Sequence, residues 1–462
     1  MFENTDQLND NNVMDLVSKF ERMQAQGQCQ YFDVDDFESL TDYYLEEFNI
    51  SQALNVIKLG LKIHPQSPSL LLKKAQLLTY SNKNEKALNV LSNVENIDPS
   101  NSDIFLAKGA IYSQLKNYNK AIEEYNKATS DAEYLDEVYC NIAFEYENLC
   151  NYEKAIEYLN KALVINPNNE SALYELGYCF EISKQSDENI KYFNAFLEEH
   201  PYSDIAWYNL ANAYNSAGLF EKAIEAYDYC LVITEDFSSA YFNKANALAN
   251  IEKYNEAIEV YKETFKYEDP EAITYYYIGE CYEKMNDLDS AFDCYLRAIE
   301  TNDKFVDAYL GLGIISDELN KTKQAIHYLE KAINIDDKNS EAWYILGDIQ
   351  FKVEKYKEAL KSYQQVVLLS PQNEDIWLDY AEIYVKSNEF AQAIEIIKEG
   401  ITIQPENASF YYRLTALLLK YSKLNEAIAY FEQAIAINKE LHQELFDYYP
   451  DSNKITEIID LL

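Results

Sequence analysis

The chain has 462 residues, with 79 acidic against 39 basic side chains and a formal net charge of −40. This excess of carboxylates argues against a nucleic-acid partner or an anionic membrane surface, because both require a basic footprint on the protein. A globular chain of this length would usually form about three domains, but an internal repeat overrules that expectation.

The first 33 residues precede the repeat. Residues 1–10 are acidic and polar, so we expect a frayed tail there and no secretory signal. A helix is expected over residues 12–26, where Gly27 can end it and where one helical stripe carries Val13, Leu16, Val17, Phe20 and Met23. Residues 28–33 would then link this helix to the repeats. We therefore expect 1–33 to be an N-terminal tail and a cap helix that covers the first repeat.

From residue 34 to residue 441 the sequence repeats every 34 residues without an insertion or deletion. The eighth position of the repeat is always small, and the twentieth is alanine in eleven of twelve repeats, with Asn189 as the exception. Two antiparallel helices approach closely only where neither carries a bulky side chain, and a large residue nearby fills the remaining volume. That large residue occupies the fourth position: Phe37, Leu71, Phe105, Tyr139, Leu173, Trp207, Tyr241, Tyr275, Tyr309, Trp343, Trp377 and Tyr411.

Residues 204–237 show one period in full. Trp207, Leu210, Ala211 and Tyr214 form one helical stripe, and a second stripe starts at Ala223. The polar segment between them contains Gly218 and is expected to be a turn. A helix pair this small cannot bury its apolar face alone, so each repeat needs a stacked neighbour.

This pattern resembles the tetratricopeptide repeat, in which an aromatic residue, a small residue, a tyrosine, an alanine and a closing proline recur in a 34-residue helical hairpin. The closing proline is present in six repeats, as Pro65, Pro99, Pro167, Pro201, Pro371 and Pro405. The resemblance implies an all-α, right-handed superhelical solenoid of twelve repeats over residues 34–441. It also implies a protein-binding scaffold whose groove is lined by the first helix of each repeat.

Repeat five is irregular, because Asn189 replaces the alanine and Phe196 replaces a small residue seven positions later. A polar side chain at a helix crossing implies a partner for its amide, a local bend between two blocks, or a compensated substitution. After residue 441 the periodicity decays, although Leu445 and Tyr448 stay in register. Pro450 breaks the pattern, and a last helix is expected over 453–462. We expect residues 442–462 to cap the C-terminal end.

The sequence offers no catalytic constellation, metal site or cofactor motif. The seven cysteines form no CxxC pair, and the four histidines have no nucleophile or metal ligand at useful spacing. Gly311-Leu312-Gly313 lacks the third glycine and the strand of a nucleotide-binding loop. Unpaired cysteines and the lack of an apolar run long enough to span a membrane favour the cytoplasm.

A candidate peptide-binding patch lies on the predicted groove positions of the central repeats. An asparagine amide both donates and accepts, so it matches one peptide unit of an extended chain, and rigid aromatics hold apolar side chains. This arrangement is similar to the asparagine ladders of some tetratricopeptide scaffolds. The alternative is that these residues are common in the family and are partly buried against adjacent repeats. The patch comprises Asn141, Tyr174, Tyr178, Tyr208, Asn209, Asn212, Phe242, Asn243, Asn246 and Tyr276.

A second candidate patch is basic and lies towards the C-terminus. It could bind an acidic segment or a C-terminal carboxylate, but lysines at helix ends also favour the helix dipole and solubility. This lysine ladder comprises Lys352, Lys386, Arg413 and Lys420.

The sequence therefore predicts a non-enzymatic scaffold that binds a protein or an extended peptide in its groove, with homo-oligomerisation left open. The alternative is a structural subunit of a fixed assembly that uses its ends or its convex face.

Overall fold

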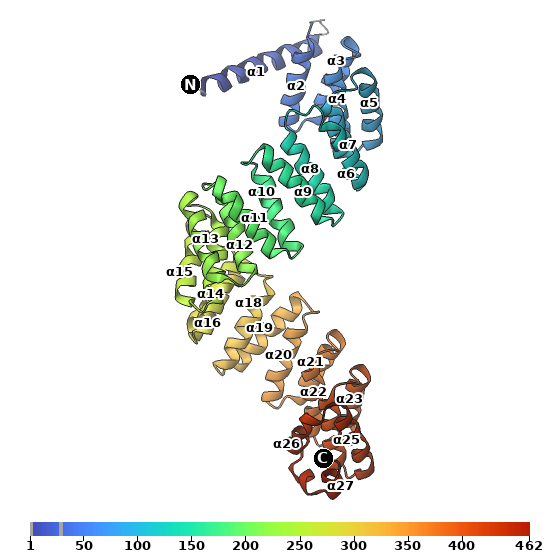
Figure 1. The fold of residues 1–462 in the computed structure, drawn as a ribbon, viewed down its shortest axis with the longest axis vertical. Helices are drawn as coiled ribbons and strands as arrows, with labels where there is room; N and C mark the ends of the chain where they lie inside the picture. The colour runs from blue at the N-terminus through green and yellow to red at the C-terminus, as the bar shows by residue number, and fades with distance from the viewer. Residues whose placement is uncertain (1–2, 27–30) are drawn as a thin grey trace. The chain divides into compact units, whose positions relative to one another are not determined.

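The computed structural model describes residues 3–26 and 31–462 (Figure 1). Every regular element in these two ranges is a helix, and consecutive helices pair into antiparallel hairpins. The predicted all-α solenoid of 34-residue repeats is confirmed. The chain divides into two compact units, Met1–Ala240 and Tyr241–Leu462. None of the described helices is long and apolar enough to cross a membrane.

Each repeat contributes two helices. The first helices are α2 (Val34–Glu46), α4 (Pro68–Tyr80), α6 (Ser102–Gln114), α8 (Leu135–Asn148), α10 (Glu170–Ile182), α12 (Asp204–Ser216), α14 (Ser238–Asn250), α16 (Ala272–Lys284), α18 (Val306–Glu318), α20 (Ser340–Lys352), α22 (Glu374–Lys386) and α24 (Ala408–Lys420). The second helices are α3 (Ile50–Ile63), α5 (Asn84–Ile97), α7 (Tyr118–Ala128), α9 (Tyr152–Ile165), α11 (Ser186–Glu199), α13 (Phe220–Ile233), α15 (Tyr254–Glu263) with the 3-10 turn η1 (Thr264–Lys266), α17 (Leu288–Thr301), α19 (Thr322–Ile335), α21 (Tyr356–Leu369), α23 (Phe390–Ile403) and α25 (Leu424–Asn438).

The close approach of the two helices in a hairpin depends on the small residue at position eight. A Cβ atom added to Gly279 would lie 2.5 Å from the ring of Tyr295, and one added to Gly347 would lie 2.6 Å from the ring of Tyr363. Both tyrosines occupy position twenty-four and are almost fully buried. The rings therefore pack directly on helix backbone, which explains why position eight excludes bulk.

The turn inside each hairpin places one residue in the left-handed region. Gly218 has φ of 72°, and the equivalent residues in the other repeats have φ between 54° and 62°. The following backbone N–H closes the turn, as where Leu219 donates to the Tyr214 carbonyl at 2.8 Å. This geometry is a helix C-terminal motif that glycine favours, yet the other eleven repeats adopt it with phenylalanine, asparagine, lysine, cysteine, glutamate or serine.

At the N-terminus, α1 (Glu3–Gln26) packs on the first hairpin through the buried Val17 and Phe20. The expected tail over residues 1–10 is wrong from Glu3 onward, because no glycine or proline interrupts the sequence before residue 27 and the helix extends back. The predicted stop at Gly27 and the first part of the linker, residues 28–30, lie outside the described residues.

At the C-terminus, a short helical segment lies on α24. Glu444 accepts a hydrogen bond from the Ser409 hydroxyl at 3.1 Å, and the Arg413 guanidinium lies 4.2 Å from the ring centroid of Tyr448. The expected last helix over 453–462 is too long, because Pro450 starts a 3-10 turn that delays the helix to Thr456. The segment comprises η2 (Lys439–His442), α26 (Gln443–Tyr448), η3 (Pro450–Lys454) and α27 (Thr456–Ile459).

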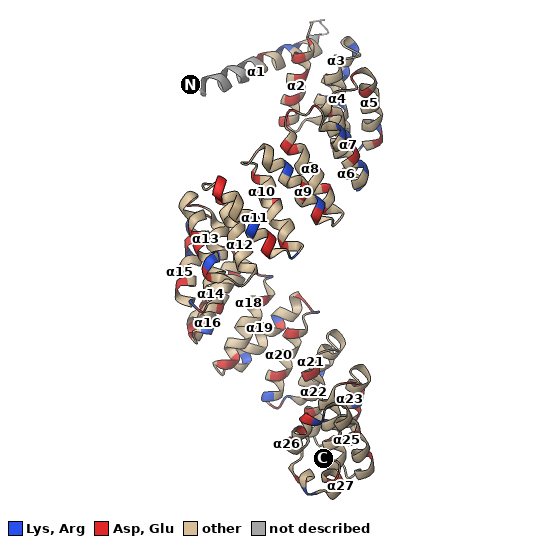
Figure 2. Ribbon diagram, in the orientation of Figure 1, with Lys and Arg blue, Asp and Glu red and all other residues tan. Residues whose placement is uncertain are grey.

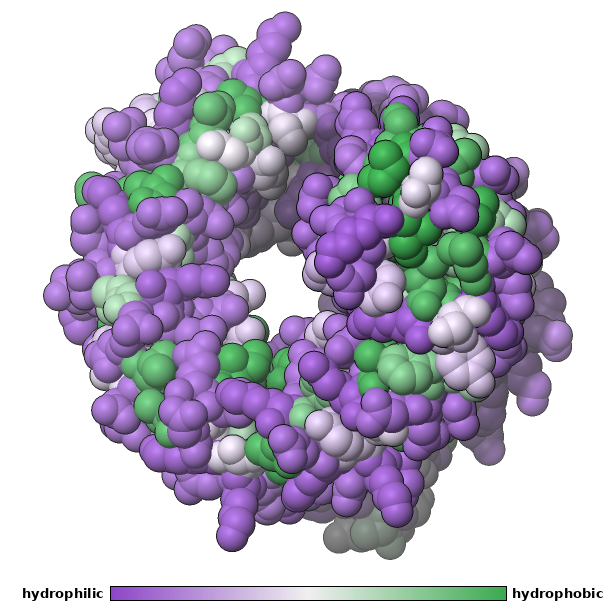
Figure 3. All heavy atoms as spheres, turned by 90° about the horizontal axis from the view of Figure 1, so that it is seen from below, coloured by the Kyte–Doolittle hydropathy of each residue, from purple (hydrophilic) through white to green (hydrophobic). Residues whose placement is uncertain are grey.

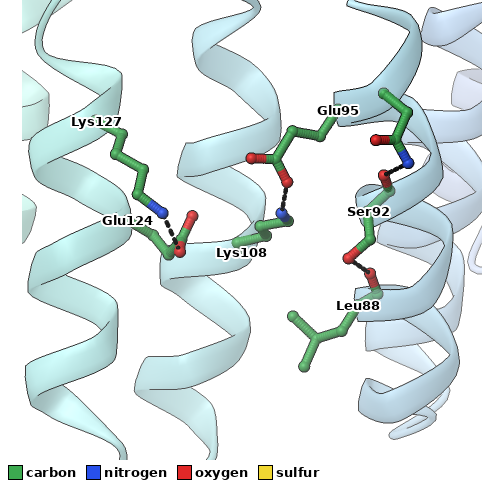
Figure 4. Close-up of polar contacts among 7 residues, drawn as sticks. Leu88, Ser92, Glu95, Lys108, Glu124 and Lys127 are labelled. Carbon is green, nitrogen blue, oxygen red and sulfur yellow. Dashed lines mark hydrogen bonds and ion pairs between the residues drawn. The ribbon is translucent and has the colours of Figure 1, made fainter. Parts of the chain in front are cut away.

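Charged residues of both signs are spread along the helices of both units (Figure 2). The buried Lys108 of α6 forms an ion pair with Glu95 of α5, which joins two neighbouring repeats (Figure 4). Lys127 and Glu124 form a second ion pair within α7, at 2.7 Å. In the view of Figure 3 hydrophilic residues cover most of the visible face, and apolar residues form separate patches.

Replacing Ala223, which is fully buried at position twenty of repeat six, with leucine is expected to lower the free energy of unfolding by roughly 1–3 kcal/mol. The added atoms have no space between α12 and α13. Chemical denaturation monitored by circular dichroism measures the change. The matched control is Lys222→Leu, on the exposed side of the same helix; an equal loss in both variants would contradict the assigned packing.

Candidate functional site

Five of the predicted groove residues line one cavity in the N-terminal unit. The cavity has a volume of 440 Å³ and lies between α10 and α12, with α11 contributing to its wall. The five are Tyr174, Tyr178, Tyr208, Asn209 and Asn212. The remaining lining residues are Glu175, Gly177, Glu181, Ser186, Asn189, Ala213 and Ser216.

Tyrosine rings form much of the apolar wall of this cavity. Tyr174 is 41% exposed and Tyr178 is 48% exposed. Tyr174 meets Tyr208 edge-on, with ring centroids 6.4 Å apart, and Tyr208 stacks on Phe237 at 5.0 Å. Tyr208 is therefore held by packing, whereas Tyr174 and Tyr178 present ring surface to solvent.

Asn209 has a structural role that the sequence interpretation did not foresee. It is only 4% exposed, and its Nδ2 donates to the backbone carbonyl of Leu173 at 2.7 Å. A Cβ atom on Gly177 would lie 2.5 Å from the Asn209 Oδ1, so this glycine makes the approach possible. The Asn209 amide joins α12 to α10, and it is not a group that a partner backbone can engage.

The asparagines at position nine are also engaged within the protein. Oδ1 of Asn212 accepts a hydrogen bond from the Tyr227 hydroxyl at 2.6 Å, and Oδ1 of Asn246 accepts one from the Tyr261 hydroxyl at 2.5 Å. Both tyrosines occupy position twenty-four of the second helix. The recurrence of tyrosine at this position can be seen in the sequence, but only the structure shows that the tyrosine hydroxyls reach the groove asparagines.

The other predicted residues do not join this site. Asn141 is exposed and lines a separate cavity of 650 Å³ among α2, α4, α6, α7 and α8. In the C-terminal unit, Phe242 packs on Tyr261 at 5.5 Å and Tyr276 packs on Phe305 at 5.5 Å, so both are half-buried packing residues. Asn243 is half-buried on α14. The alternative of partial burial between repeats fits these three residues.

The lysine ladder does not form a basic patch. Lys352 pairs with Asp317 at 2.9 Å, and Lys386 lies 3.7 Å from Glu382. Arg413 is buried and pairs with the same Glu382. Acidic residues on neighbouring groove positions thus neutralise these three charges. Lys420, exposed at the end of α24, is the one residue of the four that has no ion pair among the described residues.

Carboxylates beside the cavity were missed because acidic residues are so common in this sequence. Glu175 and Glu181 line the cavity, and Glu147 of α8 lies next to Glu175. Burial, with a further contribution from the Glu175 charge, raises the pKa of Glu147 to about 7. The cavity is therefore lined by two carboxylates, and beside them Glu147 holds its proton more tightly than an ordinary glutamate. Across residues 3–26 and 31–462, no group of three or more His, Cys, Asp and Glu is placed to hold a metal ion.

The stability of the chain should depend on the protonation of Glu147. A carboxyl group whose pKa is higher in the folded state than its usual 4.5 binds its proton more tightly when folded, so its contribution to stability is lost as pH rises towards about 7. Glu147→Gln should therefore unfold at a higher temperature than the parent at pH 8, and by a smaller margin at pH 5. The control is Glu137→Gln on the same helix, which should change little at either pH.

Asn209→Ala should lower the free energy of unfolding by about 1–3 kcal/mol, because it removes the buried hydrogen bond from the Asn209 Nδ2 to the Leu173 carbonyl. Asn141→Ala, at the same repeat position but exposed, should be nearly neutral. Urea denaturation of both variants measures the difference, and a neutral Asn209→Ala would show that the bridge is not structural.

Comparisons with known proteins agree with this architecture. Residues 232–445 match the family model of the cilia and flagella-associated protein 70 C-terminal domain, and residues 102–130, 137–169 and 190–235 match tetratricopeptide repeat models. No curated protein matches the chain with significant sequence similarity.

Several solved structures resemble the chain. MamA is 24% identical over 35% of this chain and 95% of its own, with a TM-score of 0.33. The Cut9–Hcn1 hetero-tetramer of the APC/C is 15% identical over 92% of this chain and 94% of that one, with a TM-score of 0.39. YrrB, described as having an unusual peptide-binding site, is 21% identical over 40% of this chain and 94% of its own, with a TM-score of 0.34.

Proposed function

This chain belongs to the tetratricopeptide repeat family, a helical scaffold typical of protein–protein interaction, and we propose that it binds an extended segment of a partner protein on repeats five and six. The proposed scaffold is non-enzymatic and acts in the cytoplasm. Its twelve repeats would span 34–441, between an N-terminal segment over 1–33 and a C-terminal cap over 442–462.

The observation that carries the proposal is the cavity between α10 and α12. Its tyrosine wall combines exposed apolar surface with polar groups that converge on the same space, which is the composition of binding sites. Tyr174 and Tyr178 keep more than two fifths of their surface exposed. By contrast Phe242 and Tyr276, at position five like Tyr174, are engaged in packing.

The cysteines support a binding role over a catalytic one. Burial raises the pKa of the Cys140, Cys230 and Cys281 thiols to about 12, so these groups stay protonated and unreactive near neutral pH. They pack as small apolar residues inside the helices.

The proposal predicts that the double variant Tyr174→Ser/Tyr178→Ser loses partner binding while it keeps its fold. Partly exposed aromatic residues at the centre of an interface often dominate its binding energy, so we expect retention of the partner to fall at least ~10-fold. Affinity purification from the native cell, with the parent and the variant as baits, measures this fall. Thermal melts should remain within a few degrees.

The control is Tyr202→Ser, since Tyr202 is 85% exposed in the loop between α11 and α12 and lies outside the cavity. Equal capture by all three baits would place the binding surface elsewhere. Partners that co-purify in constant stoichiometry and resist salt would favour the alternative function, a structural subunit of a fixed assembly.

A further inference from the structure

The cavity between repeats five and six contains a buried acceptor that the protein does not satisfy. Asn189 lines the cavity, is only 4% exposed, and has no hydrogen-bond donor for its Oδ1 among the described residues. Alanine occupies the equivalent position in the other eleven repeats. Buried polar atoms in folded proteins are nearly always paired, so an unpaired carbonyl on a residue that lines a cavity indicates a donor that the protein itself does not supply.

Repeat five lacks the tyrosine hydroxyl that repeats six and seven direct towards a groove asparagine. Position twenty-four is a tyrosine in repeats six and seven, and each tyrosine donates to a groove asparagine. In repeat five this position is the fully buried Phe193, which has no hydroxyl. Repeat five therefore gains an acceptor, Asn189, and lacks the hydroxyl that repeats six and seven supply from position twenty-four.

The charge of the cavity selects the kind of donor. Among the twelve described residues that line it, two are glutamates and none is a lysine or arginine. Glu175 is half-buried, and Glu181 lies near the C-terminal end of the same helix. Two carboxylates without a basic side chain beside them oppose an anionic ligand and attract a cationic one.

The tyrosines provide the remaining contacts that a cationic side chain requires. Tyr174, Tyr178 and Tyr208 surround the cavity from two helices. The faces of tyrosine rings attract cations and pack against aliphatic stems. A guanidinium group also presents five N–H donors in a planar fork, so it can donate to Asn189 and to Glu175 from different edges.

We propose that this cavity binds an arginine side chain of the partner segment, with Asn189 Oδ1 and Glu175 as acceptors and the three tyrosines as walls. The inference rests on the proposed function and specifies the chemistry of its ligand. The partner segment is therefore expected to be positively charged at this point, whereas the lysine ladder would have favoured an acidic partner.

The test titrates N-acetyl-arginine methylamide into the full-length chain labelled with ¹⁵N-asparagine. The side-chain amide resonances of Asn189 should shift with saturation. The neutral citrulline derivative should bind at least ~10-fold more weakly, because it lacks the charge. The lysine derivative distinguishes the two basic side chains: binding equal to that of arginine would overturn the preference for a guanidinium.

Asn189→Ala separates binding from folding. It restores the alanine of the other repeats and removes an unpaired buried carbonyl, so the melting temperature should hold or rise while affinity for the arginine derivative falls at least ~10-fold. Glu175→Gln should weaken binding similarly, and it keeps the test valid if Asn189→Ala does not fold. Glu199→Gln, exposed at the far end of α11, is the control with the same change of charge and should bind like the parent.

An Asn189 resonance that does not move, or affinity unchanged in both Asn189→Ala and Glu175→Gln, would overturn the arginine site. A fall in stability of Asn189→Ala without loss of binding would show instead that a buried water satisfies this amide. Neither result bears on the scaffold itself, because partner capture by the parent and its loss in the tyrosine double variant are measured separately.

Discussion

The fold depends on how closely the two helices of each hairpin approach. Position eight admits no bulk, since a Cβ atom on Gly279 or Gly347 would collide with the tyrosine ring at position twenty-four. The alanine at position twenty is fully buried in every repeat that has one, from Ala53 to Ala427. Because that crossing is the same in each repeat, each hairpin presents an equivalent face to the next, and stacking buries what one hairpin cannot bury alone. The groove positions are those on the first helices that take no part in this packing.

The candidate site lies where that rule is broken. Asn189 brings an amide into a position that is otherwise alanine, and Phe193 removes the hydroxyl that Tyr227 and Tyr261 direct towards the groove face. Meanwhile Gly177 lets the Asn209 amide reach the Leu173 carbonyl, which fixes α12 against α10. The helices around the cavity are thus joined to each other, but they give the Asn189 Oδ1 no hydrogen-bond donor. Local departures from a repeat pattern commonly mark functional positions, because they have no structural benefit of their own.

Much of the fold was predictable because it follows from spacing. The repeat period, the small residues and Gly218 specified the hairpins and turns, and five of the predicted groove residues line one cavity. The roles of individual amides were not predictable. Asn209 reaches a backbone carbonyl because it approaches Gly177 so closely that a Cβ atom there would lie 2.5 Å from its Oδ1, and the repeat spacing does not reveal this contact. The ion pairs of the lysine ladder were equally hidden from the sequence. Lys352 pairs with Asp317 of the preceding repeat, Lys386 pairs with Glu382 on its own helix, and Arg413 pairs with the same Glu382.

The C-terminal segment covers part of the surface of the last repeat. Ser409 and Arg413 occupy positions two and six of the last repeat, which are groove positions, and they are covered by Glu444 and Tyr448 of α26. Residues Ala408–Leu419 of α24 are all buried, between α23, α25 and α26. The segment therefore covers part of the α24 surface on which an extended chain could otherwise lie. The Ser409 hydroxyl and the Arg413 guanidinium are engaged within the protein and are not offered to a partner.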